Sequence, residues 1–514
     1  MSAPRSYFIT TPIYYVNDSP HIGHAYTTLS CDVLARFMRL DGYDVRFLTG
    51  TDEHGQKVEK SAAAAGLDPQ TFTDRVSQQF RDLAVRLNCQ FDDFIRTTEP
   101  RHIRSCQAIW QKLVEAGDIY PGTYAGWYAV RDEAFYAESE LVDGKAPTGA
   151  DVEWVEEPSY FFRLSAWQDR LLAFYEANPD CIGPRSRKNE VISFVRSGLH
   201  DLSVSRTSFK WGVPVPGDPA HIMYVWLDAL TNYITAVGYP DVDSALFKRY
   251  WPADLHMVGK DILRFHTVYW HAFLMAAGLA PPKRVFAHGW WTNEGQKISK
   301  SLGNVIDPLA LIAEFGLDPV RYFLLREVPF GSDGNFARNQ LIKRINTDLA
   351  NDLGNLAQRV LSMINKNCGA AVPSPGAFSA ADQTLLGAAH GLLGAVRAEM
   401  AQQAFHRALE LIWGVVSDAN RYIDEQAPWT LRKTDPARMA TVLYGLAEVI
   451  RHLGILVQPF MPESAAKILS QLALPEDARG FDRLGPAHAL APGQALPAPI
   501  GVFPRYAPPE AAAG

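Results

Sequence analysis

The amino-acid sequence predicts an α/β fold, in which a doubly wound parallel sheet is split by an inserted module and followed by an all-α helical bundle. Three observations predict this arrangement. Residues 7–50 have the pattern of strand, helix and strand, the same alternation returns after residue 216, and apolar residues after position 339 are spaced three or four apart. Each spacing is typical of the element it predicts.

The first strand is predicted at residues 7–15, where β-branched and aromatic residues form a continuous run. The following helix has an apolar residue at every fourth position, namely Ala25, Leu29, Val33 and Phe37. Gly42 is expected to end it, and a second strand is expected to stop at Gly50. Strand, helix and strand at this spacing form the βαβ unit that opens Rossmann-like nucleotide-binding folds.

The later parts of the chain differ in pattern from this opening. Between residues 120 and 216, Gly-, Tyr- and Trp-rich turns and a run of charges interrupt the periodicity, which indicates an insertion into the sheet. A long amphipathic helix is predicted after residue 339, with apolar positions Leu341, Ile345, Leu349, Leu353, Leu356, Val360 and Ile364. The last 29 residues contain seven prolines, so an extended strap is expected there.

These patterns predict six segments along the chain. They are 1–117, the first half of the doubly wound domain; 118–223, the insertion; 224–290, the second half of the doubly wound domain; 291–338, a region with a basic loop; 339–472, the helical bundle; and 473–514, the Pro-rich strap.

Composition excludes several classes of protein. The net charge of -7, from 49 basic and 56 acidic residues, does not suit a protein that coats nucleic acid through a general basic field. No run of about 18 uncharged apolar residues predicts a membrane span, and the N-terminus lacks the apolar region of a signal peptide. The five cysteines include no CxxC pair, which favours a reducing, cytoplasmic location.

The segment NDSPHIGHAYTTL places two histidines at a predicted helix start. Ser19 is predicted as the N-cap and Pro20 as the first helical residue. His21 and His24 then lie in the first turn, where backbone N–H groups and the helix dipole attract phosphate. Gly23 costs about 1 kcal/mol relative to alanine in a helix, which is reasonable if a flat ring must lie on the backbone. These residues alone suit a helix start with two surface histidines equally well.

Zinc is another ligand that paired histidines suggest. A zinc site needs further ligands at a defined spacing. The chain has neither an HExxH pattern nor two cysteines close together in sequence. No metal is therefore expected at these histidines.

A second motif, GQKISKSLG, covers residues 295–303. Lys297 and Lys300 alternate with small and hydroxyl residues between two glycines. This pattern predicts a mobile basic loop that can close over a polyphosphate and neutralise developing charge. An ordinary solvated loop is the alternative. The chain contains no Walker A sequence, so a P-loop is not expected.

Taken together, an HxGH after the first strand and a distant KxSKS resemble the signature pair of class I aminoacyl-tRNA synthetases. Further stretches are similar to the bacterial-type methionyl-tRNA synthetases over essentially the whole chain: PIYYVNDSPHIGHAYTT, FLTGTDEHGQKV, YVWLDALTNY, GKDILRFH and HGWWTNEGQKISKSLGNV. The resemblance implies a Rossmann-like catalytic domain split by a connective-peptide insertion, a stem-contact region at 291–338 and an anticodon-binding helical bundle.

The resemblance also implies roles for single residues. ATP is expected to be bound by His21, Gly23, His24, Asp261 and Lys300, with Mg²⁺ accompanying the nucleotide. Catalysis is expected from both histidines and from Lys297 and Lys300, where Lys300 matches the lysine that stabilises the pentacovalent phosphate. The methionine carboxylate would attack the α-phosphate and expel pyrophosphate, so positioning and charge neutralisation would supply the catalysis. The 2′-OH at the tRNA 3′ end would then accept the methionyl group.

For methionine, the resemblance implies a pocket of Ile13, Tyr15, Asp52, Trp226, Ala229, Tyr233, Ile262 and His266. Asp52 is similar to the carboxylate that takes the substrate's ammonium group, and an aromatic lining suits a polarizable thioether. Without the resemblance, Trp226 and Tyr233 would be interpreted as helix core and His266 as a structural histidine. Asp52 could equally cap the helix that follows its strand.

In the helical bundle, the resemblance implies that Asn355, Arg359 and Trp429 meet the CAU anticodon. An amide, a guanidinium and an aromatic face are the groups that unstacked RNA bases require. A solvent-facing pair and a packing tryptophan are the alternative.

The insertion departs from the family pattern. Many members carry CxxC zinc knuckles there, but this chain has Ala129 and Asp132 instead. No structural zinc is therefore expected, and the insertion should be held by its own packing around Trp127, Tyr128 and Phe135.

The expected partners are methionine, ATP and tRNA(Met), both initiator and elongator, for a monomer without membrane contact. Synthetases for isoleucine, valine and leucine need a large editing insertion, which residues 118–223 leave no room for, and the zinc ligands of the cysteine enzyme are absent. A small cytidylyltransferase-like enzyme would not need the helical bundle. A non-catalytic tRNA-binding paralogue remains the alternative of a different class, although the intact histidines and lysines oppose it.

Overall fold

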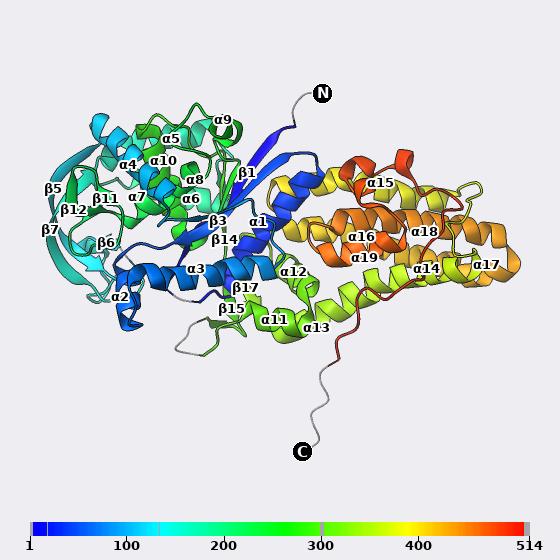
Figure 1. Ribbon diagram of the computed structural model, residues 1–514. Coiled ribbons are helices and arrows are strands. Elements are labelled where there is room, and N and C mark those ends of the chain that lie inside the picture. Colours follow the sequence, from blue (N-terminus) through cyan, green and yellow to red (C-terminus); the bar gives the residue numbers. More distant parts are fainter. Residues whose placement is uncertain (1–3, 18, 133, 299–302, 508–514) are drawn as a thin grey trace, which may run out of the picture. The chain divides into compact units, whose positions relative to one another are not determined.

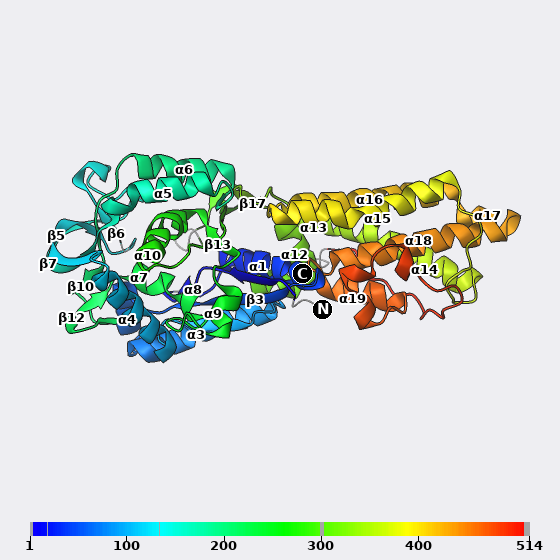
Figure 2. The ribbon, with the colours of Figure 1, turned by 90° about the horizontal axis from the view of Figure 1, so that it is seen from above.

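The computed structural model describes residues 4–17, 19–132, 134–298 and 303–507. The chain divides into two compact units. Unit 1 consists of Met1–Cys31 and Asp44–Gly289, and unit 2 of Asp32–Tyr43 and Trp290–Gly514. Helix α1 (Ile22–Leu40) contributes its first part to unit 1 and its second part to unit 2. Figures 1 and 2 show the ribbon from two directions.

Unit 1 is built on a seven-stranded sheet, called here the parallel sheet, in which every pair of neighbouring strands is parallel. Its order is β2-β3-β1-β13-β14-β8, with β4 also paired to β3. The strands are β1 (Ser6–Thr10), β2 (Tyr14–Tyr15), β3 (Asp44–Asp52), β4 (Asp93–Arg96), β8 (Ile182–Gly183), β13 (Leu255–Gly259) and β14 (Val285–His288). The predicted doubly wound α/β fold is confirmed.

Two details of the predicted βαβ unit are wrong. The single strand predicted at residues 7–15 is two strands, β1 and β2, because Pro12 between them has no N–H to donate to a ladder. Gly50 does not end β3, which continues to Asp52. A Cβ on Gly50 would collide with the backbone oxygen of Ile95 in β4, so this glycine allows two strands to approach closely.

Helices surround this sheet. The predicted apolar face of α1 is buried, with Ala25, Leu29, Val33 and Phe37 at most 2% exposed. The other helices of unit 1 are α2 (Gln56–Ala64), α3 (Pro69–Arg86), α4 (Pro100–Glu115), α5 (Gln168–Ala177), α6 (Arg185–Arg196), α7 (Val225–Leu230), α8 (Asn232–Thr235), α9 (Ala245–Tyr250) and α10 (Trp270–Ala276). A 3₁₀ turn at Lys260–Ile262 and a π-helical turn at Phe265–Tyr269 precede α10.

The inserted segment forms two small antiparallel sheets. In the first the order is β6-β5-β7-β9, and in the second β10-β12-β11. Their strands are β5 (Ile119–Ala129), β6 (Ala134–Tyr136), β7 (Glu153–Phe162), β9 (Leu202–Ser203), β10 (Ser205–Arg206), β11 (Pro214–Val215) and β12 (Asp218–Met223). Both views place β5 and β7 beside one another at the edge of unit 1 (Figures 1 and 2). Within the same segment, β8 instead joins the parallel sheet.

Unit 2 combines a small sheet with the C-terminal helices. The sheet has the order β16-β15-β17, from β15 (Trp291–Asn293), β16 (Gln296–Lys297) and β17 (Gly334–Phe336). The helices are α11 (Pro308–Phe315), α12 (Leu317–Arg326), α13 (Arg338–Arg344), α14 (Asn355–Asn367), α15 (Ala380–Ala401), α16 (Phe405–Gln426), α17 (Pro428–Thr434), α18 (Pro436–Val457) and α19 (Pro462–Gln471). Helices α15, α16 and α18 lie side by side in both views, which confirms the predicted bundle (Figures 1 and 2).

The long amphipathic helix after residue 339 is confirmed, with one difference. Its apolar positions, Leu341, Ile345, Leu349, Leu353, Leu356, Val360 and Ile364, are all at most 4% exposed. Between α13 and α14 the helix is π-helical over Ile345–Gly354. Apolar spacings of three and four do not distinguish a π-helical stretch from an α-helical one, so this difference could not be predicted from the spacing.

The C-terminal part of unit 2 follows α19 as an extended segment with short 3₁₀ turns at Glu476–Ala478, Phe481–Arg483 and Pro486–His488. It pairs with the loop after α14 through a bridge between Ala371 and Ala495. Of the described helices, α18 is long and apolar enough to cross a membrane, and 94% of its apolar window is buried within the protein. That burial is typical of a core helix.

Candidate active site

Five of the predicted site residues of unit 1 lie at the carboxyl ends of the parallel strands. Ile13 and Tyr15 follow β1, Asp52 is the last residue of β3, and Asp261 and Ile262 follow β13. Between β3 on one side and β13 on the other, β1 is where the winding of the sheet changes direction. Ligands of doubly wound sheets bind at the carboxyl ends next to such a switch point. Asp261, predicted for ATP, therefore shares one edge of the sheet with four residues predicted for methionine, Ile13, Tyr15, Asp52 and Ile262.

Helix α1 begins at Ile22, and the predicted start at Ser19 and Pro20 is wrong. His21 takes the N-cap position, because its carbonyl accepts hydrogen bonds from the N–H groups of His24 (3.0 Å) and Ala25 (3.2 Å). The two histidines also cap the helix reciprocally. The Gly23 N–H donates to His21 Nδ1 (3.1 Å) and the His21 N–H donates to His24 Nδ1 (3.1 Å). Imidazole nitrogens here replace the hydroxyl and carboxylate of a capping box.

This capping arrangement fixes the tautomers of both histidines. Partial desolvation lowers the pKa of His21, although this residue is exposed, and burial together with the nearby His21 lowers the pKa of His24 well below its ordinary value, so both rings are neutral near pH 7. Since each Nδ1 accepts a hydrogen bond, each ring carries its proton on Nε2. Among the described residues neither Nε2 has a hydrogen-bond partner. The helix start therefore offers two neutral N–H donors to an anion.

Gly23 has a neighbour that the sequence did not predict. A Cβ at this position would lie 2.9 Å from Cε1 and 3.2 Å from Nδ1 of His21. The imidazole of His21 thus occupies the space next to Gly23 that a side chain would need. The absence of a Cβ keeps that ring against the first turn of the helix.

Helix α1 is also attached to the end of β14. Thr27 Oγ1 lies 2.7 Å from Nε2 of His288, and the His288 ring packs edge-on against Tyr26 at 5.2 Å between centroids. His288 is buried and was not among the predicted site residues. Its contact with α1 helps to set where the histidine pair stands over the sheet edge.

Three of the predicted methionine residues, Trp226, Tyr233 and His266, form one aromatic cluster. Tyr233 Oη lies 2.7 Å from His266 Nε2, and the Trp226 ring meets the His266 ring edge-on at 6.3 Å. Tyr233 and His266 are at most 2% exposed, whereas Trp226 is half-buried. Ile13, Tyr15 and Ile262 are partly buried against the large hydrophobic core of unit 1, which contains Tyr233, and Ala229 is buried. Trp226 and Tyr233 lie on two short helices, α7 and α8, and not on one core helix.

Proton positions in this cluster follow from its hydrogen bonds. Burial lowers the pKa of His266 to about 4, so its ring is neutral near pH 7. His266 Nδ1 donates to the carbonyl of Ile262 (2.9 Å), so Nε2 must accept, and Tyr233 Oη–H donates to it. The tyrosine proton is thereby committed within the cluster.

Phe265 extends this cluster, and it was not among the predicted site residues. Its ring stacks on Trp226 with 3.8 Å between centroids and 5° between planes. It immediately precedes His266 in the predicted motif, but an apolar residue in an apolar segment gave no functional signal.

The alternative interpretation of Asp52, as the cap of the next helix, is wrong. The N-cap of α2 is Gly55, and α2 has no side-chain cap. Asp52 is 7% exposed and its backbone pairs with Tyr15 of β2. Asp52 is therefore buried at the end of β3, beside Tyr15, another of the predicted methionine residues.

Asp261 lies on the 3₁₀ turn after β13 and is exposed. A Cβ on Gly259 would stand 2.6 Å from Asp261 Oδ1, so the glycine makes room for this carboxylate at the end of β13.

The basic loop belongs to unit 2. Lys297 ends β16 and is exposed, its backbone pairs with Thr292, and its carbonyl accepts a hydrogen bond from Asn304 Nδ2 (3.0 Å). Lys300 lies outside the described residues. The base of the predicted loop is thus a small hairpin with an exposed lysine.

The three predicted anticodon residues also come together. Asn355 and Arg359 lie on α14, and the Arg359 guanidinium lies 5.4 Å from the centroid of the Trp429 ring on α17. Arg359 additionally contacts Asp424 at 2.5 Å. Trp429 is 43% exposed, and Asn355 is exposed. An open aromatic face with a cation above it differs from the packing tryptophan of the alternative reading.

In the insertion, hydrogen bonds converge on a residue that replaces a knuckle cysteine. The Asp132 carboxylate accepts from Arg131 Nε (3.2 Å), from Tyr136 Oη (3.1 Å) and from Thr148 Oγ1. Ala129 packs in a small core with Ala146 and Ala150.

The predicted packing of the insertion is partly supported. Trp127 packs edge-on against Trp154 at 5.3 Å, and Tyr128 is 7% exposed. The side chain of Phe135 lies outside the described residues. The contributions of Asp132 and Ala129 to this packing were not predicted, because at their positions the sequence showed only the absence of cysteine.

Comparison with known proteins agrees with this geometry. Residues 7–151 and 140–361 match the family described as tRNA synthetases class I (M), and residues 372–511 match the anticodon binding domain of methionyl tRNA ligase. The chain is 59% identical over 507 residues to the methionine–tRNA ligase of Mesorhizobium japonicum and 60% identical over 508 residues to that of Brucella suis. Each alignment covers 98% of both proteins.

A solved structure extends the similarity to the fold. Mycobacterium tuberculosis methionyl-tRNA synthetase in complex with methionyl-adenylate superposes with a TM-score of 0.95 at 57% identity, covering 98% of this chain and 100% of that one. Matches of this identity along nearly the full length show common descent of both the catalytic and the helical regions. The chain therefore belongs to the methionyl-tRNA synthetase family of class I aminoacyl-tRNA synthetases.

Proposed function

We propose that this chain activates methionine with ATP and transfers the methionyl group to the 3′-terminal adenosine of tRNA(Met), using the residues described above. The observations that support this assignment are two neutral histidine donors at the start of α1 and a buried aromatic cluster around His266, both in the unit that contains the parallel sheet. A nucleotide and an amino acid with an apolar side chain would then lie side by side, as the reaction between them requires.

In the activation step, the methionine carboxylate attacks the α-phosphorus of ATP and pyrophosphate leaves. The carboxylate is already a nucleophile, so the protein needs no general base. His21 and His24 would donate their Nε2–H groups to phosphate oxygens, where charge develops. Lys297 and Lys300 would bring positive charge to the same phosphates, and Asp261 would contact the ribose.

Methionine recognition divides between charge and shape. The Asp52 carboxylate would accept the ammonium group, and the side chain would enter the cluster of Trp226, Tyr233 and His266. Because the Tyr233 proton is committed to His266, the cluster is suited to a thioether, which is a weak acceptor. Ile13, Tyr15, Ala229 and Ile262 complete the proposed lining.

Mg²⁺ is proposed to enter with the ATP phosphates, which are its preferred hard oxygen ligands. No zinc is proposed for the insertion. The Asp132 hydrogen bonds and the alanine core occupy the place of the knuckle, and they supply no cysteine ligands.

Transfer requires the tRNA. Asn355, Arg359 and Trp429 are proposed to bind the unstacked CAU anticodon of both initiator and elongator tRNA(Met), because a ring under a guanidinium is a stacking platform for a base. We further propose a cytoplasmic monomer, and we retain the segment boundaries given above from 1–117 to 473–514.

Amino-acid-dependent ATP–pyrophosphate exchange, measured with each of the standard amino acids, tests this function. Exchange with methionine alone is the expected result. Exchange with another amino acid would point to a different class I synthetase. Absence of exchange with every amino acid, together with retained tRNA binding, would identify a non-catalytic tRNA-binding paralogue.

A further inference from the structure

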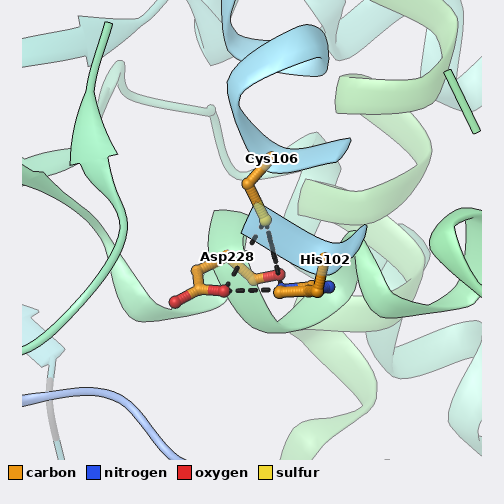
Figure 3. A group of neighbouring side chains, drawn as sticks. All are labelled: His102, Cys106 and Asp228. Carbon is orange, nitrogen blue, oxygen red and sulfur yellow. Dashed lines mark hydrogen bonds and ion pairs between the residues drawn. The ribbon is translucent and has the colours of Figure 1, made fainter. Parts of the chain in front are cut away.

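A buried carboxylate in unit 1 connects three elements that carry or adjoin the proposed methionine site. Asp228 on α7 is fully buried, and its two oxygens face two histidines. Oδ2 lies 2.6 Å from Nδ1 of His54, and Oδ1 lies 2.7 Å from Nε2 of His102. Figure 3 shows His102 of α4 and Asp228 of α7 pointing toward one another, with Cys106 above them.

The direction of these hydrogen bonds follows from the ionisation of Asp228. Burial alone would raise its pKa, but attraction to His54 and the hydrogen bonds from both histidines outweigh burial and lower it well below the ordinary range. An ionised carboxylate only accepts hydrogen bonds. His54 Nδ1–H and His102 Nε2–H therefore both donate to it, and each carboxylate oxygen has a donor.

Each partner of Asp228 belongs to a different part of the site. His54 is two residues from Asp52, the proposed ammonium ligand at the end of β3. Asp228 itself lies on α7 between Trp226 and Ala229 of the proposed methionine pocket. On the far side of the second histidine, His102 Nδ1 lies 3.3 Å from Thr235 Oγ1 at the end of α8, the helix that carries Tyr233.

Glu53, between Asp52 and His54, is also held by hydrogen bonds. The Glu53 carboxylate accepts from Arg96 Nε (2.7 Å) and from Thr98 Oγ1 (2.6 Å). The position of the segment after β3 thus depends on two buried carboxylates, one in the segment and one on α7. Breaking the bond from Asp228 frees one side of this segment while the other remains attached.

A metal ion is the other occupant that this cluster suggests, since the ligand atoms of His102, Cys106 and Asp228 lie within 4.8 Å of one another. Tetrahedral zinc with bonds of about 2.0–2.3 Å separates its ligand atoms by about 3.3 Å or more. The 2.7 Å between His102 Nε2 and Asp228 Oδ1 is shorter than this and is the length of a charge-assisted hydrogen bond. Burial and the charge of Asp228 also raise the pKa of Cys106, which keeps it a thiol. A proton, not a metal, joins these groups.

We propose that Asp228 is a positioning residue for methionine, which holds Trp226 and Ala229 of α7 in register with Asp52 through its hydrogen bonds to His54 and His102. Asp228 is fully buried and both its oxygens are engaged, so it acts through these neighbours. The proposal rests on the proposed function, because it concerns the affinity for methionine. Loss of a hydrogen bond to a charged group is expected to weaken methionine binding by about tenfold or more.

The test uses variants of the full chain in methionine-dependent ATP–pyrophosphate exchange, with KM measured separately for methionine and for ATP. Asp228→Asn keeps the shape but replaces one accepting oxygen by an amide that donates. The KM for methionine is expected to rise about tenfold or more, with the KM for ATP changed less than about twofold. A folded variant with unchanged KM for methionine, or with both KM values raised together, overturns the proposal.

Two pairs of histidine variants keep the test decisive if Asp228→Asn does not fold. The asparagine amide stands where Nδ1 of histidine stands, and the glutamine amide where Nε2 stands. His54→Asn and His102→Gln therefore retain the donor to Asp228 and should keep the KM for methionine near the parent value, whereas His54→Gln and His102→Asn should raise it several-fold. Equal values within each pair would contradict the positioning role.

Two further measurements separate the remaining outcomes. Metal analysis of the parent protein is expected to find no transition metal that Asp228→Asn loses, and one equivalent lost in this variant would overturn the proposal in favour of a metal site. If the parent protein shows no exchange with methionine, the proposed function itself fails, and this is seen before any variant is compared.

Discussion

Replacement of Gly23 by alanine should slow methionine activation while it leaves the stability of the protein nearly unchanged. The new Cβ would stand 2.9 Å from Cε1 of His21. Atoms in folded proteins do not pack that closely, so the His21 ring must turn away. Since His21 is exposed, its ring can move into solvent at little cost.

The two contributions to stability nearly cancel. Alanine gains up to about 1 kcal/mol over glycine in a helix. Loss of the hydrogen bond from the Gly23 N–H to His21 Nδ1 costs about 0.5–1.5 kcal/mol. Activity should respond quite differently, because the displaced ring no longer directs its Nε2–H at the phosphates. Removal of one donor to developing charge typically lowers kcat by about 10²–10³.

ATP–pyrophosphate exchange at saturating methionine and thermal unfolding, measured on the same preparation, test this expectation. Gly391→Ala in α15 is the matched control, because its Cβ would meet nothing within 4 Å and the position is exposed. That control should gain up to about 1 kcal/mol of stability with unchanged exchange. A folded Gly23→Ala variant with the exchange rate of the parent would refute the reasoning about His21.

Three further predictions concern other parts of the chain. Lys300→Ala should abolish exchange and leave methionine binding, measured by calorimetry, largely intact; equal loss of both would contradict a role at the phosphates. Trp429→Ala should remove about 1–3 kcal/mol of base stacking, and should therefore slow tRNA charging without changing exchange. Parallel loss in both assays would count against an anticodon site. Burial holds the pKa of His266 at about 4 and that of His271 at about 3. The unfolded chain therefore takes up protons first, and urea unfolding should show stability falling as pH drops from about 6.5 towards 4, by about 3 kcal/mol for His266. A flat profile across this window would contradict neutral buried histidines.

The fold class could be predicted because its signals are local. The apolar face of α1 and that of the helix after residue 339 are repeated over many turns, and both are buried as expected. Single positions were less predictable. Pro12 divides the first predicted strand. Gly50 lies within β3, where the neighbouring strand β4 leaves no room for a Cβ. In the sequence, a glycine that allows two strands to approach closely cannot be distinguished from a glycine that ends an element.

The prediction of where α1 starts was wrong for a similar reason. Ser19 and Pro20 match the usual preferences for N-cap and first turn, but the chain begins α1 at Ile22. His21 and His24 supply the capping acceptors through Nδ1. Preferences drawn from many helices describe hydroxyl and carboxylate caps, so they miss a pair of rings that cap one another. The motif that signals chemistry here also builds its own local structure.

The Asp228 network shows where sequence reasoning reaches its limit. An acid within the apolar run YVWLDALTNY signals a buried carboxylate, and a buried carboxylate must have hydrogen-bond donors. The sequence does not say which donors, because His102 and His54 stand 126 and 174 residues away along the chain. Only the parallel sheet, which brings α4, α7 and the end of β3 together, selects these two among the 14 histidines. Since the partners are specified by topology, a change at His54 or His102 should alter methionine binding even though neither residue was among the predicted site residues.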